Sequence, residues 1–203
     1  MAYTTAHCGL YWEGKVEEGE TVLITGSSGA VSLAAIDIAK SLGARVIAVA
    51  SSPERLAVAK EHGADAEIDY SAAPIKEAVM NFTDGRGVNV AFDPVMGSLY
   101  QNVLGSLDWD GWHVIIGFAG GKIPQIPSNR ILVKNRRARG MVMSYYRYRR
   151  PELMQRTVQT LFRWYEAGKI HPHITRTRPL EKARDFLVAI IGRKPIGRAI
   201  LEI

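Results

Sequence analysis

Residues 21–32 read Thr-Val-Leu-Ile-Thr-Gly-Ser-Ser-Gly-Ala-Val-Ser. The first five residues are typical of a buried β-strand, and apolar residues at helical spacing follow the two glycines as far as Leu42. A strand that ends in a glycine-rich turn and leads directly into a helix is the setting in which backbone amides bind a pyrophosphate. This stretch therefore predicts the first βα unit of a dinucleotide-binding fold.

The pattern of that unit recurs along most of the chain. Apolar runs predict strands at 22–25, 45–50, 66–69, 88–92 and 112–117. Between them, helical spacing predicts helices at 29–42, 53–62, 73–82 and 98–107. Turns are expected at Asp84-Gly85 and Asp110-Gly111. Strands that alternate with helices of about ten to fifteen residues are typical of right-handed βαβ units. The predicted fold class is therefore α/β, a doubly wound parallel sheet (Rossmann fold) in three layers.

The carboxyl-terminal part of the chain continues with a less regular pattern. We predict a sixth strand at 139–144, helices at 151–167 and 180–191, and a terminal strand at 196–203. The expected organisation has three parts. Residues 1–18 form a connecting helix and entry segment, 19–145 form the Rossmann core, and 146–203 supply helices and a final strand that pack on the same domain.

Size and composition narrow the class of protein. The 203 residues suit one domain, and a hydrophobic content of 47% is sufficient for a large core. No apolar run reaches the roughly 18 residues that a membrane helix requires, and the first residues do not resemble a signal peptide. Cys8 is the single cysteine, which excludes an internal disulfide and a multi-cysteine zinc site. We expect a cytoplasmic protein with no membrane partner.

The formal net charge of +6 is concentrated in one stretch. Its cations are Lys134, Arg136, Arg137, Arg139, Arg147, Arg149 and Arg150. With Tyr145, Tyr146 and Tyr148 between them, they resemble a single-strand nucleic-acid platform. No RNA- or DNA-binding motif accompanies them, so the sequence favours a solvated sheet edge, whose charges discourage unwanted pairing, over a nucleic-acid partner.

The glycine-rich turn offers candidate ligands for a pyrophosphate. Gly26 is expected to make the tight turn and Gly29 to let the backbone approach the phosphates. Ser32 stands where a small residue lets the helix lie close to the sheet. The backbone around Gly29 supplies the remaining candidates, Ser27, Ser28, Ala30 and Val31. A Walker loop is excluded because the turn lacks Gly-Lys-Ser/Thr, and Ala30 breaks the Gly-x-Ser-x-Gly pattern of a hydrolase.

The end of the second predicted strand favours NADP over NAD. NAD sites place an Asp or Glu there for the ribose hydroxyls, but the chain has Ser51 and Ser52 and no acid before Glu54. A 2′-phosphate would accept hydrogen bonds from the serines, and Arg55 offers it a planar guanidinium. Tyr70, at the end of the third strand, could close over the same group.

Segment 19–44, which contains the turn, resembles the medium-chain dehydrogenase/reductase superfamily and, more narrowly, its zinc-independent quinone oxidoreductase branch. Further matches follow in order: Ser51-Ser-Pro-Glu-Arg-Leu, Gly63-Ala-Asp, Ile68-Asp-Tyr70, Asp93-Pro-Val, Gly117-Phe-Ala, Gly168-Lys-Ile-His-Pro and Gly197-Arg-Ala-Ile-Leu. The likeness covers nearly the whole chain. Ala30 and Ser32 depart from it, since the family usually has glycine at both places, and the Ala30 methyl is expected to crowd the pyrophosphate.

The resemblance implies hydride transfer from NADPH to a quinone or other conjugated carbonyl, without zinc. It places Gly117, Phe118 and Ala119 beside the nicotinamide and Thr5 below it, and it implies that Asp93, Pro94 and Val95 shape the strand end next to the ribose. It identifies no catalytic proton donor. His171 and His173 make a poor zinc site because neither a carboxylate nor a cysteine is near them in sequence.

The family also carries an amino-terminal domain that walls the active-site cleft, and this chain starts at the connecting helix. We therefore expect NADPH binding in the micromolar range or weaker, low or absent turnover, and a homodimer through the sheet edge at 139–144. The alternatives are a non-catalytic NADP(H)-binding module or sensor, and a basic RNA-binding protein.

Overall fold

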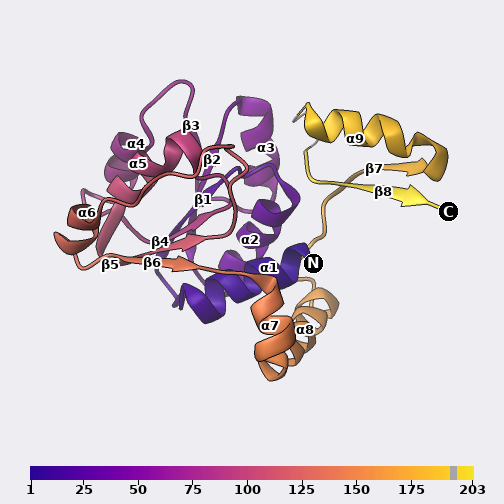
Figure 1. Cartoon of the computed structure of the whole chain (residues 1–203), viewed down its shortest axis with the longest axis horizontal. Helices are drawn as coiled ribbons and strands as arrows, with labels where there is room; N and C mark the ends of the chain where they lie inside the picture. Colours follow the sequence, from indigo (N-terminus) through magenta and orange to yellow (C-terminus); the bar gives the residue numbers. More distant parts are fainter. Residues whose placement is uncertain (193–195) are drawn as a thin grey trace.

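The computed structural model describes residues 1–192 and 196–203, and its centre is a six-stranded parallel sheet (Figure 1). The strands lie in the order β3-β2-β1-β4-β5-β6. Their bounds are β1 (Thr21–Thr25), β2 (Arg45–Ala50), β3 (Ala66–Asp69), β4 (Val88–Asp93), β5 (Leu107–Ile115) and β6 (Arg137–Gly140). The helices between them are α2 (Ala30–Ser41), α3 (Pro53–Glu61), α4 (Ile75–Phe82) and α5 (Tyr100–Gly105). The predicted α/β class and doubly wound topology are confirmed.

The strand order reverses between β1 and β4, which places the ligand crevice of such a sheet. β1 pairs with β2 on one side and with β4 on the other, both in parallel. The chain therefore leaves these two neighbouring strands toward opposite faces. In open α/β sheets, ligands bind at this switch point beyond the carboxyl ends of the strands.

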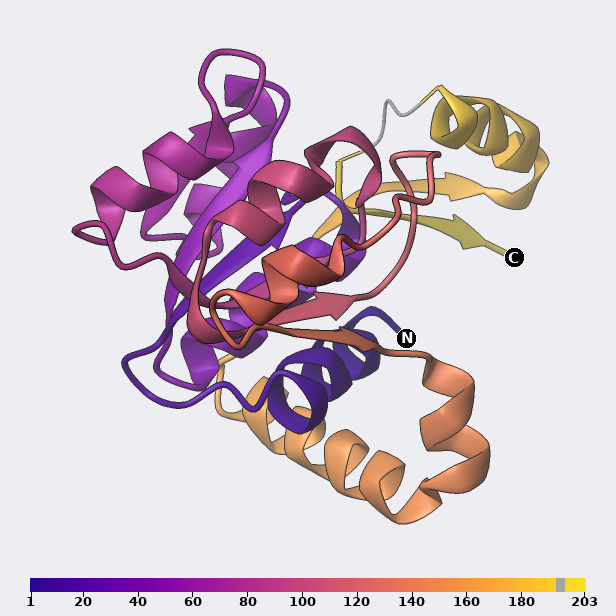
Figure 2. The same cartoon turned by 60° about the vertical axis from the view of Figure 1, so that its left-hand side comes forward.

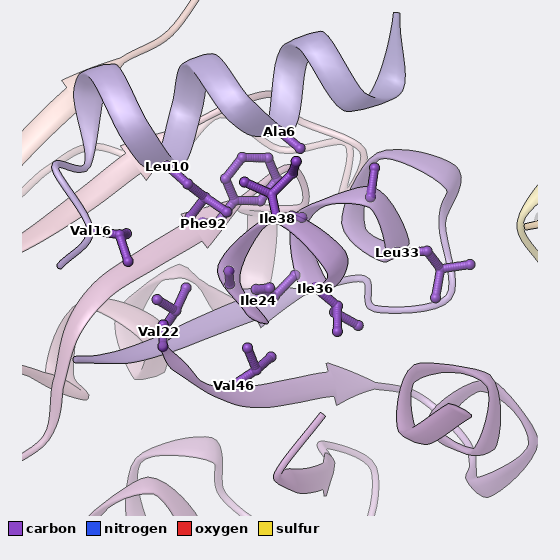
Figure 3. Packing of buried hydrophobic residues seen from close by; sticks show 14 of the residues in the cluster. Ala6, Leu10, Val16, Val22, Ile24, Leu33, Ile36, Ile38, Val46 and Phe92 are labelled. Carbon is purple, nitrogen blue, oxygen red and sulfur yellow. The ribbon is translucent and has the colours of Figure 1, made fainter. Parts of the chain in front are cut away.

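Two apolar clusters hold the helices to the faces of the sheet. On one face, α1 (Ala2–His7), the π-helical turn η1 (Cys8–Glu13) and α2 pack over β1, β2 and β4. Figure 3 shows Leu10, Ile38 and Phe92 meeting at the centre of that cluster. On the other face, Val79 of α4 and Val103 of α5 pack against the remaining strand side chains. Together they form the three predicted layers.

Two expectations at the sheet edge were wrong. The Asp110-Gly111 turn lies inside β5, where Asp110 has φ +57° and the β4–β5 register shifts between Val88 and Val90. The sixth strand is Arg137–Gly140 rather than 139–144, because helix α7 (Met143–Arg149) begins at Met143.

The edge strand and α7 are tied to η1 through one buried carboxylate. Glu13 accepts a hydrogen bond from the Tyr146 hydroxyl at 2.6 Å and from Arg139 Nε at 2.5 Å. The long helix α8 (Pro151–Glu166) then runs beside α1, as Figure 2 shows. These contacts fix the entry segment against the core.

The carboxyl-terminal residues form a second sheet of two parallel strands, β7 (Ile174–Pro179) and β8 (Arg198–Glu202). Between them lie η3 (Leu180–Lys182) and α9 (Ala183–Ile191). Helix α9 and strand β8 were predicted from the sequence, and β7 was not. In Figure 1 this unit stands beside the end of the main sheet where the crevice is expected. Within the described residues, no helix combines the length and apolar character that a membrane span requires.

Native Cys8 is expected to react very slowly with a thiol reagent. Its side chain is fully buried, and burial raises the pKa of the thiol to about 11. Since the thiolate is the reactive form, almost none is present at pH 8. A colorimetric thiol assay should give a slow phase in buffer and an immediate reaction in denaturant; fast labelling of folded protein would contradict the packing of η1.

Candidate nucleotide-binding site

The glycine-rich turn connects β1 to α2 through a conformation that favours glycine. Gly26 has φ +58°, and a Cβ there would lie 2.8 Å from Cγ2 of Val95. Gly29 has φ −79° and ψ 152°, an extended geometry open to other residues, and it is the N-cap of α2. The close approach at Gly26 brings the end of β1 against the loop after β4.

Two serine hydroxyls brace this turn from below. Ser27 Oγ donates to the backbone oxygen of Ile24 or Val49 and accepts from the amide of Val49 at 2.6 Å. Ser32 Oγ donates to the carbonyl of Thr25 at 2.9 Å. Because both hydroxyls are buried and occupied, their work is to shape the turn.

The first turn of α2 leaves amides available to an anion. The amides of Ala30 and Val31 donate no hydrogen bond to any of the described residues, and both residues are half-buried. Helix N-termini carry such unsatisfied donors together with the positive end of the helix dipole. Arg55 of α3 approaches the turn from the helix that follows β2, where its Nη1 donates to Ser28 Oγ at 2.9 Å. The turn can therefore hold a pyrophosphate by backbone donors and positive potential.

The carboxyl ends of β2 and β3 bring the predicted adenosine-end residues together. Ser52 is the N-cap of α3 without a side-chain capping bond, and Ser51 is exposed beside it. The amide of Tyr70 donates to the carbonyl of Ala50 at 3.1 Å, which places Tyr70 at the same edge. Asp69 lies opposite Ala50 in the pairing of β2 with β3. Its Oδ1 is occupied, because it accepts hydrogen bonds from the amide and the hydroxyl of Ser71.

Asp93, which is predicted to shape the strand end next to the ribose, is fully buried at the end of β4. Oδ1 accepts from Thr25 Oγ1 at 2.6 Å and from the amides of Val95 and Met96 at 3.0 and 2.8 Å. Oδ2 lies 3.0 Å from Nε2 of His113. Burial alone would raise the pKa of Asp93, but His113 and these donors bring it below its ordinary value. The ionised carboxylate therefore organises the site from within.

The loops after β4 and β5 are laced together at this edge. The amide of Ala119 donates to the carbonyl of Pro94 at 3.0 Å, and that of Gly120 donates to Val95 at 2.8 Å. Gly117 is half-buried, and Phe118 is 44% exposed. The expected nicotinamide residues thus form one backbone-bonded surface, on which the Phe118 ring is accessible.

Thr5 lies near the carboxyl ends of the strands, as do the residues expected at the nicotinamide. A Cβ at Gly14 would meet Val90, and one at Gly9 would meet Phe92. The first helix therefore runs antiparallel to β4, so Thr5, one turn before Gly9, lies toward the carboxyl end of that strand. Its side chain is half-buried.

Two features of the site were missed by the sequence analysis. The amide of Gly197 donates to the carbonyl of Ser28 at 2.8 Å, and Gly197 forms a parallel bridge with Gly29. Arg198 and Ala30 line a cavity of about 160 Å³ with Tyr3 and Pro172. The signal for this segment was the family match at Gly197. The second missed feature is the contact of His113 with Asp93, for which the sequence offers only a histidine inside a predicted strand.

The described residues contain no group of three or more His, Cys, Asp or Glu side chains that could hold a metal ion. His173 lies 5.5 Å from His62, between ring centroids, and His62 bonds to Asp37. The amide of His171 also donates to Asp37. The amide of His171 thus fastens the carboxyl-terminal segment to α2, and the histidine side chains do not form a zinc site with other ligands among the described residues.

The chain is similar in sequence to curated proteins described as quinone oxidoreductases or as quinone oxidoreductase-like. The quinone oxidoreductase-like protein 2 of Rattus norvegicus is 36% identical over 204 residues, covering 100% of this chain and 58% of that protein. A quinone oxidoreductase from Pseudomonas aeruginosa is 30% identical over 90% of this chain and 56% of its own length. The chain thus spans little more than half of these curated relatives.

Solved structures match over the whole chain. A mycobacterial protein complexed with NADPH superimposes with a TM-score of 0.91 at 26% identity, covering 100% of this chain and 64% of that one. A quinone oxidoreductase of Pseudomonas syringae gives a TM-score of 0.88 at 27% identity, covering 100% and 62%. The zinc-binding dehydrogenase profile matches residues 30–159. Because this profile covers more than half of the sequence, the chain belongs to the zinc-binding dehydrogenase family, within the medium-chain dehydrogenase/reductase superfamily.

Proposed function

We propose that the chain binds NADP(H) and forms the cofactor half of an oxidoreductase that reduces a quinone or another conjugated carbonyl. The observation that carries the proposal is the combination at one edge of the sheet: available amides at Ala30 and Val31, Arg55 at the turn, and a β2 end without an acid. The NADPH complex of the mycobacterial relative and the names of the curated relatives support it.

NADPH, when bound, supplies the hydride. The chain's own residues would hold and orient it: the α2 amides bind the pyrophosphate, and Ser51, Ser52 and Arg55 face the 2′-phosphate. The loops at 94–97 and 117–121, with the exposed ring of Phe118, would hold the nicotinamide end. Although the family's name refers to zinc, the described residues bring together no three His, Cys, Asp or Glu side chains that could hold that metal. The acceptor side depends on the whole protein.

Arg55→Gln is expected to lower the affinity for NADPH about tenfold while changing that for NADH less than about threefold, because a guanidinium–phosphate bond is charge-assisted. Isothermal titration of both nucleotides measures the ratio. Lys60→Gln is the matched control, since Lys60 lies on the same helix and is 72% exposed. An unchanged NADPH-to-NADH preference in Arg55→Gln would remove the proposed role of this cation.

A non-catalytic NADP(H) module remains the second candidate, and turnover with a quinone separates the two. NADPH binding with no quinone reduction would favour the module. RNA binding is less favoured, because several cations of the 134–150 stretch have partners within the chain. Arg139 bonds to Glu13, Arg136 to the carbonyl of Leu107 and Arg150 to Glu152. We also propose a homodimer through the exposed edge strand β6, which gel filtration would test.

A further inference from the structure

A buried histidine stands behind the crevice, where no ligand reaches it. His113 lies in β5 with no exposed surface, and its Nε2 is 3.0 Å from Oδ2 of Asp93. The ring of Tyr100 stacks on it at 5.4 Å between centroids, with 18° between the planes. Packing and the hydrogen bond thus hold the imidazole in one orientation.

The other ring nitrogen of His113, Nδ1, takes no part in the bond to Asp93. Among the described residues, Nδ1 of His113 has no hydrogen-bond partner although it is buried. An unpartnered lone pair costs less than an unpartnered N–H, so the proton lies on Nε2 and is donated to Asp93. An apolar side chain at position 113 would leave no buried polar atom without a partner. We take this to indicate that the histidine serves to make the hydrogen bond to Asp93.

Asp93 connects the fixed imidazole of His113 to the loop that follows β4. Its Oδ1 accepts from the amides of Val95 and Met96, and Met96 is held at φ +55°, where non-glycine residues are rare. Val95 in turn accepts from the amide of Gly120 and lies against Gly26. One carboxylate therefore connects His113 with both loops and with the phosphate turn.

We propose that His113 is a positioning residue: by holding Asp93, it sets the loops at 94–97 and 117–121 in the arrangement that receives the nicotinamide end of the cofactor. The role in binding rests on the proposed function. The role in loop geometry rests only on the contacts of this chain. His113 touches no cofactor atom and takes no part in hydride transfer.

The test compares His113→Phe with His113→Gln. Phenylalanine keeps the ring against Tyr100 but removes the donor, whereas glutamine can place an amide N–H near the position of Nε2. In His113→Phe we expect NADPH affinity to fall about tenfold, the effect of about 1.4 kcal/mol. Affinity for 2′,5′-ADP, which lacks the nicotinamide end, should change less than about twofold. His113→Gln should recover most of the NADPH affinity.

His62→Phe is the matched control, because it removes the donor from a second buried pair, His62–Asp37, away from the two loops. It should leave the ratio of NADPH to 2′,5′-ADP affinity unchanged. Hydrogen exchange provides a readout without any ligand: His113→Phe should speed exchange at 94–97 and 117–121, and His62→Phe should not. If His113→Phe does not fold, Thr25→Val removes another donor to Asp93 and should speed exchange in the same loops.

Equal loss of both ligands, or loop exchange equal to that of the wild type, would overturn the proposal. If the wild-type chain binds no NADPH, the proposed function fails, while the exchange rates still decide whether His113 positions the loops.

Discussion

Gly26→Ala is expected to abolish measurable NADPH binding and to lower the free energy of unfolding by about 2 kcal/mol, because alanine at positive φ is strained and the site has no room. The added methyl would lie 2.8 Å from Val95 Cγ2. Val95 cannot yield easily, since its amide bonds to Asp93 and its carbonyl accepts from Gly120. Calorimetric titration and urea unfolding measure the two effects.

Gly85→Ala separates backbone strain from the clash. Gly85 has φ +79°, with nothing within 4 Å of an added Cβ, and it lies in the turn before β4, away from the carboxyl edge. It should be destabilised by about 1 kcal/mol while keeping its NADPH affinity. If Gly26→Ala binds NADPH as well as Gly85→Ala does, the close approach of β1 and the β4 loop is not required for the site.

Asp93→Asn is expected to lower the free energy of unfolding by about 3 kcal/mol at pH 7, because it removes a buried carboxylate on which several hydrogen-bond donors converge. The NH2 group of asparagine would face either His113, in place of Oδ2, or Thr25 and the amides of Val95 and Met96, in place of Oδ1, so at least one donor would lose its acceptor. Urea unfolding measures the difference. Asp110→Asn is the control, because the ion pair of Asp110 with Arg137 is exposed and should change stability by less than about 0.5 kcal/mol.

The same substitution predicts a pH dependence with a definite sign. The pKa of Asp93 in the folded protein lies below its ordinary value, so its contribution is fully present above about pH 4, the unfolded pKa. It is lost as the pH falls through the lower, folded pKa. The gap in stability between wild type and Asp93→Asn should therefore shrink as the solution is acidified below pH 4. A gap that widens on acidification would contradict the assigned direction.

Local pattern predicted the interior of the fold well, because the buried strands are short apolar runs and their helices carry clear apolar faces. β2 and β3 have the predicted bounds. The edge was harder. All residues of β6 are exposed, and its position is set by pairing with β5, from Trp112–Arg137 to Ile115–Gly140. β7 is likewise exposed throughout, so no apolar run marks it.

The parts of the candidate site that depend on consecutive residues could be predicted from the sequence. The glycine turn and the acid-free end of β2 are local, and the structure brings them to one edge. The buried contacts of Asp93 could not be predicted in this way, because its partners Thr25 and His113 lie on neighbouring strands and far from it in the sequence. A pairing between distant segments leaves no trace in local spacing, which is also why the contact of Gly197 with Ser28 was missed.

That last contact has a consequence for the newly made protein. The glycine turn is translated early, yet the hydrogen bond that braces its Ser28 carbonyl comes from Gly197, far downstream in the sequence. Chains fold from the amino terminus as they emerge from the ribosome, and partners distant in sequence pair late. A nascent chain therefore carries a turn without this hydrogen bond until the segment that contains Gly197 has emerged and paired with it.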